Sequence, residues 1–228
     1  MVTSTKQNPL PMKVSGVLFD LDGTILDTAG DLGGALNKVL ANHQLPTLTE
    51  QVYRPVVSDG AKGLLTLGFG DKLHSYDYDA LRAELLEYYD AHIAEHTHLY
   101  QHMGQFLSLL DSRSIPWGIV TNKPEGLSLK LVPNFPELNS SKVLVGGDSL
   151  TNNKPHPEPM FYAANALNVP ANECLYIGDA PRDVEAGNAA NMYTVAALWG
   201  YISDKSVCKQ WGADFLADSP ADLHQLIL

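Results

Sequence analysis

Short runs of β-prone apolar residues alternate with segments of helical periodicity along most of the chain. The clearest run, Val17–Phe19, stops at Asp20, and Gly23 follows in what the sequence predicts to be a tight loop. Four further strands are predicted at residues 116–122, 143–145, 174–177 and 193–197. Since helical or turn-rich stretches separate these runs, the pattern predicts an α/β fold with a Rossmann-like, doubly wound parallel sheet.

The segment from Asp31 to about His98 has a different pattern and contains no convincing strand. Leu32, Leu36 and Val39 recur at helical spacing, which predicts an all-α insert of about 70 residues. The first thirteen residues are polar and interrupted by two prolines, so we expect a flexible tail. The predicted boundaries are 1–13 for the tail, 14–28 and 100–228 for the core, and 29–99 for the insert.

Composition narrows the possible partners and compartments. The formal net charge of −11 argues against a broad nucleic-acid-binding surface or a patch for anionic membranes. No apolar run approaches the ~20 residues of a membrane span, and the first residues carry no targeting pattern. We expect a cytoplasmic protein with a small-molecule partner, and the sequence does not indicate an oligomeric state.

Asp20 and Asp22 are the first candidates for chemistry. A turn explains D-x-D-G about as well as a functional site does, because Asp and Gly are common turn residues. The alternative is a phosphoryl-transfer site in which one carboxylate is a nucleophile and the other a general acid and base. The rest of the chain decides between these interpretations.

Polar residues of a matching chemical type follow the other predicted strands. The carboxyl ends of parallel strands share one edge of the sheet, where ligands bind in open α/β folds. Side chains spread over about 160 positions are therefore expected in one crevice, a coincidence that turns alone do not explain. These residues are Asp20 and Asp22, Thr121 and Asn122, Lys154, and Asp179 and Asp183.

The order of these motifs resembles the haloacid dehalogenase superfamily. D-L-D-G-T at 20–24 is followed by T-N at 121–122, K-P-x-P-E-P at 154–159 and G-D-x-x-x-D at 178–183. The first motif is similar to that of the superfamily's phosphatases and phosphomutases, rather than its dehalogenases or ion pumps. By this resemblance the insert is a helical cap that closes over the core, and the chain is a phosphoric monoester hydrolase acting on a small phosphorylated metabolite.

The resemblance also implies roles for single residues. Asp20 is the nucleophile that forms an aspartyl-phosphate, and Asp22 protonates the leaving group and then activates water. Mg²⁺ is held by Asp20, the backbone carbonyl of Asp22 and Asp179. Asp183 binds the metal through a water molecule or lies behind its direct ligands. The phosphoryl oxygens contact Thr121 and Asn122, and Lys154 balances negative charge.

Within the cap, Arg54 and the loop up to Lys62 are the expected specificity contacts. The chain resembles a subgroup labelled phosphoglycolate phosphatase, while R-P-V-V-S at 54–58 and the W-G-Y-I and W-G-A-D segments within 199–214 are similar to N-acetylmuramic acid 6-phosphate phosphatases. Lys62 stands where that subgroup favours arginine. A phosphosugar mutase and a non-catalytic binding protein on the same fold remain as alternatives.

Overall fold

The computed structural model describes residues 2–5 and 13–227, and these form two compact units. The first comprises Met1–Leu26 and Leu99–Leu228, apart from the positions outside the described ranges, and the second comprises Asp27–His98. The chain passes between the units through two short paired strands, β3 (Leu26–Asp27) and β4 (His98–Leu99). Within the described residues, no helix has the length and apolar character needed to cross a membrane.

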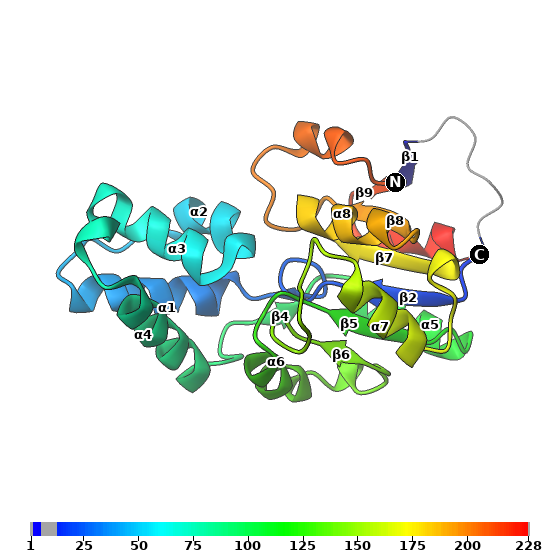
Figure 1. Cartoon of the computed structure of the whole chain (residues 1–228), viewed down its shortest axis with the longest axis horizontal. Helices are drawn as coiled ribbons and strands as arrows, with labels where there is room; N and C mark the ends of the chain where they lie inside the picture. The colour runs from blue at the N-terminus through cyan, green and yellow to red at the C-terminus, as the bar shows by residue number, and fades with distance from the viewer. Residues whose placement is uncertain (1, 6–12, 228) are drawn as a thin grey trace. The chain divides into compact units, whose positions relative to one another are not determined.

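A seven-stranded sheet forms the centre of the first unit (Figure 1). All neighbouring strands in it are parallel except β1, which pairs antiparallel with β9. The order across the sheet is β1 (Val2–Ser4), β9 (Phe215–Ala217), β8 (Tyr193–Ala197), β7 (Cys174–Gly178), β2 (Gly16–Phe19), β5 (Trp117–Val120) and β6 (Leu144–Val145).

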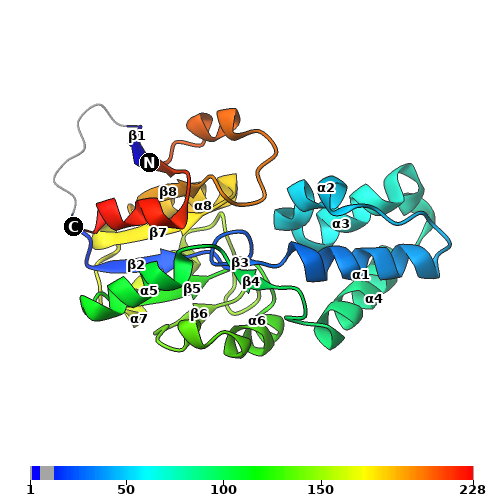
Figure 2. The ribbon, with the colours of Figure 1, turned by 180° about the vertical axis from the view of Figure 1, so that it is seen from behind.

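Helices cover both faces of this sheet. Its described residues contain four α-helices: α5 (Met103–Ser112), α6 (Glu125–Leu131), α7 (Glu158–Ala166) and α8 (Pro181–Ala189). Helices α7 and α8 lie on one face, and α5 lies on the other (Figures 1 and 2). Short 3₁₀ helices complete the described part: η3 (Val132–Asn134), η4 (Pro136–Leu138), η5 (Ala171–Glu173), η6 (Lys205–Gln210) and η7 (Pro220–Leu226).

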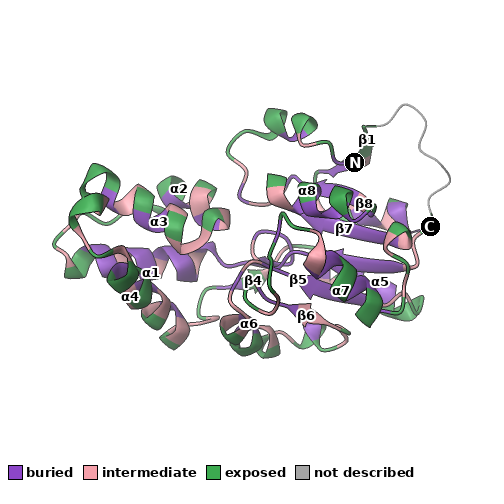
Figure 3. Ribbon diagram, in the orientation of Figure 1, coloured by how far each residue is buried: buried purple, intermediate pink, exposed green. Residues whose placement is uncertain are grey.

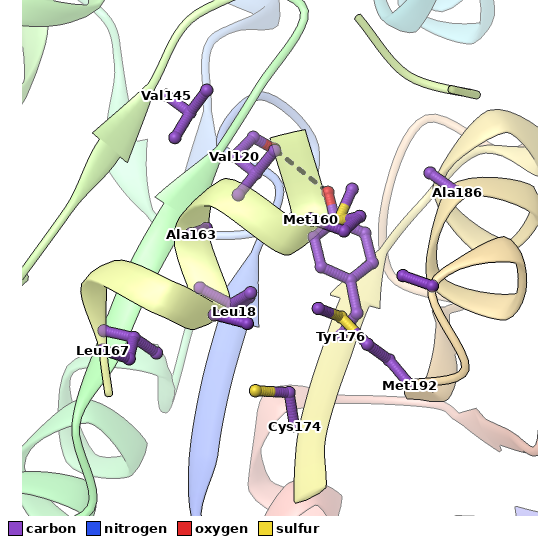
Figure 4. Packing of buried hydrophobic residues seen from close by; sticks show 12 residues of the cluster. Leu18, Val120, Val145, Met160, Ala163, Leu167, Cys174, Tyr176, Ala186 and Met192 are labelled. Atoms are coloured by element: carbon purple, nitrogen blue, oxygen red, sulfur yellow. Dashed lines mark hydrogen bonds between the residues drawn. The ribbon is translucent and has the colours of Figure 1, made fainter. Parts of the chain in front are cut away.

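The alternation of side chains along β2 explains these two layers. Leu18 packs into a buried cluster with Met160 of α7 and Ala186 of α8 (Figure 4). The next residue, Phe19, points to the opposite face, where its ring lies 6.1 Å from that of Phe106 in α5. Because both faces are covered, β2, β5 and β7 are buried throughout (Figure 3), and their apolar runs show no polar alternation.

The strand order places Asp20 at a topological switch point. From β2 the chain moves outward on one side through β5 and β6, and then returns to the other side of β2 through β7. Connections that leave a strand in opposite directions open a crevice at its carboxyl end. The residues that follow β2 therefore lie where this fold binds ligands.

One expectation fails at the N-terminus. The sequence predicts a flexible tail over residues 1–13, but Val2–Ser4 forms β1 against β9. Strand β9 was not predicted either, because a three-residue strand shows almost no periodicity. In the folded chain, β9 offers backbone hydrogen-bond partners at its edge to the β-prone Val2 and Thr3. The rest of the predicted tail, residues 6–12, lies outside the described residues.

The second unit is helical, as its pattern predicts. It contains α1 (Ala29–Asn42), α2 (Glu50–Tyr53), η1 (Arg54–Asp59), α3 (Gly60–Phe69), η2 (Gly70–Ser75) and α4 (Tyr78–Ala91). The buried carboxylate of Asp31 joins its two ends, because it accepts hydrogen bonds from the backbone amides of His96 and Thr97 and from the Thr97 hydroxyl, at 2.6–3.0 Å.

Candidate active site

The loop after β2 holds Asp20 and Asp22 in a fixed backbone. The Asp20 amide continues the parallel pairing by donating to the Ile177 carbonyl at 2.9 Å. Gly23, with a φ of +85°, turns the chain so that its amide donates to the Leu26 carbonyl at 2.9 Å. The D-x-D-G motif therefore forms a turn that begins directly after the central strand.

Three buried carboxylates gather at this edge of the sheet. Asp20, Asp179 and Asp183 each offer one oxygen, and these oxygens lie within 4.8 Å of one another. Asp20 follows β2, while Asp179 follows the neighbouring strand β7, so the parallel pairing brings together residues far apart in the sequence. The Asp22 side chain is not part of this group, and the contact of its backbone carbonyl with a metal stays a prediction.

The carboxylates strongly affect one another. Burial, together with the charges of Asp20 and Asp183, raises the pKa of Asp179 to about 7. Burial also raises the pKa of Asp183, although Lys154 acts in the opposite direction. A buried cluster of this kind favours a bound cation, and a set of carboxylate oxygens suits Mg²⁺. The described residues therefore fit the metal that the family resemblance implies.

Lys154 places a positive charge beside two carboxylates of this cluster. Its fully buried ammonium lies 2.9 Å from Asp20 Oδ1 and 2.7 Å from Asp183 Oδ1. It also donates to the Val120 carbonyl and to the Tyr176 hydroxyl, both at 2.8 Å. The Tyr176 hydroxyl in turn donates to the Val120 carbonyl at 3.0 Å (Figure 4). Burial raises the pKa of Tyr176 well above 10, so this hydroxyl keeps its proton.

Asn122 fixes the segment that carries Lys154. The Asn122 side chain donates to the Lys154 carbonyl at 2.8 Å and accepts from the Lys154 amide at 3.1 Å. Thr121, also buried, accepts from the Lys123 amide at 3.2 Å. The structure thus brings Thr121 and Asn122 to the predicted edge, and their contacts with a phosphoryl group stay a prediction.

A loop after β8 supports Asp179, and sequence reasoning did not assign it this role. The Tyr201 amide donates to Asp179 Oδ2 at 2.9 Å, and the Trp199 indole donates to the Thr24 carbonyl at 3.0 Å. A Cβ added to Gly200 would lie 2.3 Å from the Asp179 Cβ, so only glycine fits there. The W-G-Y-I segment was a sequence signal, but it indicated a relative and not a contact.

Lys123 is a second site residue that was not predicted. Its ammonium forms an ion pair with Asp22, 3.0 Å from Oδ1 and 3.3 Å from Oδ2. This lysine directly follows the T-N motif at 121–122, but no pattern indicated which carboxylate it would contact.

The two predicted cap residues lie in the second unit. Arg54, at the start of η1, forms ion pairs with Asp27 and with Glu50, the latter at 2.9 Å. Lys62, in α3, is exposed. Their contact with a substrate stays a prediction.

Known proteins resemble the chain over nearly its whole length. Residues 17–197 match the model of the haloacid dehalogenase-like hydrolases. A phosphoglycolate phosphatase of Xanthomonas campestris is 41% identical over 92% of this chain and 94% of that protein. An N-acetylmuramic acid 6-phosphate phosphatase of Pseudomonas aeruginosa is 37% identical over 95% and 96%, respectively. Both relatives are phosphatases, which confirms the predicted class of phosphoric monoester hydrolase.

A solved structure supports the same fold. A crystal structure described as a predicted phosphoglycolate phosphatase, from Haemophilus somnus, superposes with a TM-score of 0.85 at 23% identity, over 96% of this chain and all of that one. At this identity the likeness concerns the fold, and it confirms the predicted Rossmann-like class. With the family match and the two relatives, the chain belongs to the haloacid dehalogenase-like hydrolases.

Proposed function

We propose that this chain is a Mg²⁺-dependent phosphatase that hydrolyses the phosphate monoester of a small metabolite through an aspartyl-phosphate on Asp20. The observation that carries the proposal is the placement of Asp20 at the switch point, within 4.8 Å of two further buried carboxylates and paired with Lys154 at 2.9 Å. This arrangement combines a nucleophile, a fixed positive charge and a metal-ligand set.

The two oxygens of Asp20 have different surroundings. Oδ1 contacts Lys154 and accepts from the Leu21 amide at 2.8 Å, whereas Oδ2 has no hydrogen bond among the described residues. In the first step an oxygen of this carboxylate attacks phosphorus, and the bond from phosphorus to the ester oxygen breaks. Asp22 gives its proton to that departing oxygen, which leaves as an alcohol.

The second step returns the enzyme to its starting state. Asp22, now a carboxylate, takes a proton from water, and the water oxygen attacks phosphorus. The bond between phosphorus and Asp20 breaks, and inorganic phosphate leaves. Lys154 stays beside Asp20 in both steps and offsets the negative charge that develops there.

Asp20, Asp179 and the backbone carbonyl of Asp22 would hold Mg²⁺. Asp183 has less capacity for a direct contact, because Oδ1 binds Lys154 and Oδ2 accepts from the Ala180 amide at 3.0 Å. When bound, the metal supplies positive charge that allows an anionic nucleophile to approach an anionic phosphate.

The substrate we propose first is 2-phosphoglycolate, and the second is N-acetylmuramic acid 6-phosphate. Both follow from relatives that align over more than 90% of this chain. We place the activity in the cytoplasm, and we propose Arg54 and Lys62 as contacts for the leaving group. Fractionation of cells that express the tagged chain tests the compartment.

The test of the proposed function is the ratio of kcat/KM for the two substrates with Mg²⁺, because this ratio measures discrimination. A strong preference for either one identifies the substrate, and Arg54→Gln and Lys62→Gln should change the ratio while Arg82→Gln, an exposed cap control, should not. If the wild type released no phosphate from either of the two substrates or from an aryl phosphate, the phosphatase proposal would be refuted. An absolute requirement for a bisphosphate activator would indicate a mutase instead.

A further inference from the structure

The ion pair between Lys123 and Asp22 is the part of the site that the mechanism above does not use. The Lys123 side chain is 5% exposed and that of Asp22 is 15% exposed. A lysine is seldom buried to this extent without a specific partner. Here its ammonium faces both oxygens of the carboxylate that acts as acid and base, at 3.0 and 3.3 Å.

The backbone around Lys123 is held by other contacts. Its carbonyl accepts from the Gly147 amide at 2.8 Å, and its own amide donates to the Thr121 hydroxyl at 3.2 Å. The Asp22 loop likewise has its own backbone hydrogen bonds, through Gly23 and Leu26. Each strand-end loop is therefore closed without the ion pair, and the contact joins the side chains of two separately fixed loops.

The chemistry of an ammonium limits what Asp22 can do beside it. A lysine ammonium has donors and no acceptor, so it pairs best with the carboxyl oxygen that does not carry the proton. Lys123 is nearer to Oδ1 than to Oδ2. When Asp22 is the acid, the shorter contact favours a proton on Oδ2, and the two contacts together restrain the rotation of the carboxyl group.

We propose that Lys123 is a positioning residue that orients the Asp22 carboxyl group for proton transfer to the leaving oxygen. The ammonium also lies where negative charge develops on Asp22 as the proton departs, and a fixed charge of this kind lowers the barrier. This inference rests on the proposed function. In this scheme Lys123 assists the departure of the leaving group through Asp22, and Lys154 supports the nucleophile Asp20.

This assignment separates two kinds of substrate. An alkyl phosphate needs a proton on its leaving oxygen, whereas p-nitrophenolate leaves as a stable anion without one. The kcat/KM value covers only the steps up to the first departure of the leaving group, so the later role of Asp22 as a base does not enter it.

The experiment compares Lys123→Met, Lys123→Arg and the exposed control Lys142→Met. With Mg²⁺, kcat/KM is measured for the better of the two proposed alkyl substrates and for p-nitrophenyl phosphate. For Lys123→Met we expect a loss of roughly 10- to 100-fold on the alkyl phosphate, and of less than about 3-fold on the aryl phosphate. Arginine, which retains the charge, should recover part of the loss, and Lys142→Met should match the wild type.

Equal losses on both substrates would overturn the inference, because they would mean that Lys123 supports the folded structure or contacts the phosphoryl group. No loss on either would overturn it too. Retained aryl-phosphate activity shows that a variant is folded, and its melting temperature provides a second check. These outcomes differ from a failure of the proposed function, in which the wild type releases phosphate from no ester.

Discussion

Lys154 lies between two carboxylates for which we propose different tasks. On one side it contacts Asp20, which is proposed to attack phosphorus, and on the other it contacts Asp183, which borders the metal-ligand set. The side chain of Asn122 fixes its backbone, and the hydroxyl of Tyr176 supports its ammonium. A buried charge requires such complete pairing, because each unpaired charge in this environment strongly destabilises the folded state.

Replacing Asp20 tests the nucleophile directly. Asp20→Asn should lower kcat by at least about 10³-fold, because an amide does not form the aspartyl-phosphate. The variant should fold, since it removes one of three clustered negative charges and leaves Lys154 paired with Asp183. Steady-state kinetics and the melting temperature measure the two effects. Asp148→Asn, an exposed aspartate after β6, is the matched control. Turnover near the wild-type rate would remove Asp20 from this role.

At the scale of elements, the site consists of loops that follow parallel strands. The loop after β2 supplies Asp20 and Asp22, and the loop after β7 supplies Asp179. The loop after β8 contributes no charged group, but its Tyr201 amide holds Asp179 and its Gly200 packs against it. Groups that support a metal ligand in this way commonly affect metal affinity 10- to 100-fold.

Gly200→Ala tests this support. The added Cβ would lie 2.5 Å from Asp179 Oδ2 and 2.6 Å from the Gly23 carbonyl oxygen, so Asp179 or the loop has to move. We expect Mg²⁺ affinity to fall by about 10-fold, as measured by titration calorimetry. Gly126→Ala, in α6, is the control because an added Cβ meets nothing within 4 Å there. An unchanged affinity in Gly200→Ala would contradict the proposed role of the loop.

At the scale of the whole molecule, the buried carboxylates link stability to pH, and under the proposed function they would also link it to Mg²⁺. The pKa of Asp179 is raised to about 7 from an ordinary value of 3.8, mainly by burial and then by its two carboxylate neighbours. A proton on Asp179 therefore stabilises the metal-free folded state. This contribution is complete below pH ~4 and is lost as the pH rises through 7. Under the proposed function, Mg²⁺ bound at Asp179 would compete with the same proton.

Mg²⁺ should therefore raise the melting temperature more at pH 8 than at pH 5.5. We expect the two gains to differ by roughly 4–8 °C, which corresponds to about 2 kcal/mol in a chain of this size. Thermal unfolding with Mg²⁺ and with a chelator measures both gains. Asp179→Asn is the control, and it should remove most of the pH dependence. Equal gains at both pH values would exclude Asp179 as the group that links metal and proton.

Elements with a strong local pattern could be predicted from the sequence alone. Buried parallel strands are continuous apolar runs, so the central strands could be predicted, and abrupt polar ends marked the edge where the site lies. Four motifs in order were enough to indicate the family. The weakest local signals failed, as at β1 and β9, where strands of three residues depend on each other for pairing.

The contacts between side chains of different segments could be read from the folded chain alone. The sequence placed Lys123 beside Asn122, but the contact of Lys123 with Asp22 depends on the pairing of β2 with β5 and on the closure of both loops. Tyr176 lies in a strand that the sequence predicted, but the role of its hydroxyl in the site depends on the pairing of β7 with β2. Local periodicity carries no information on such long-range side-chain directions, because they are set by packing between segments far apart in the chain.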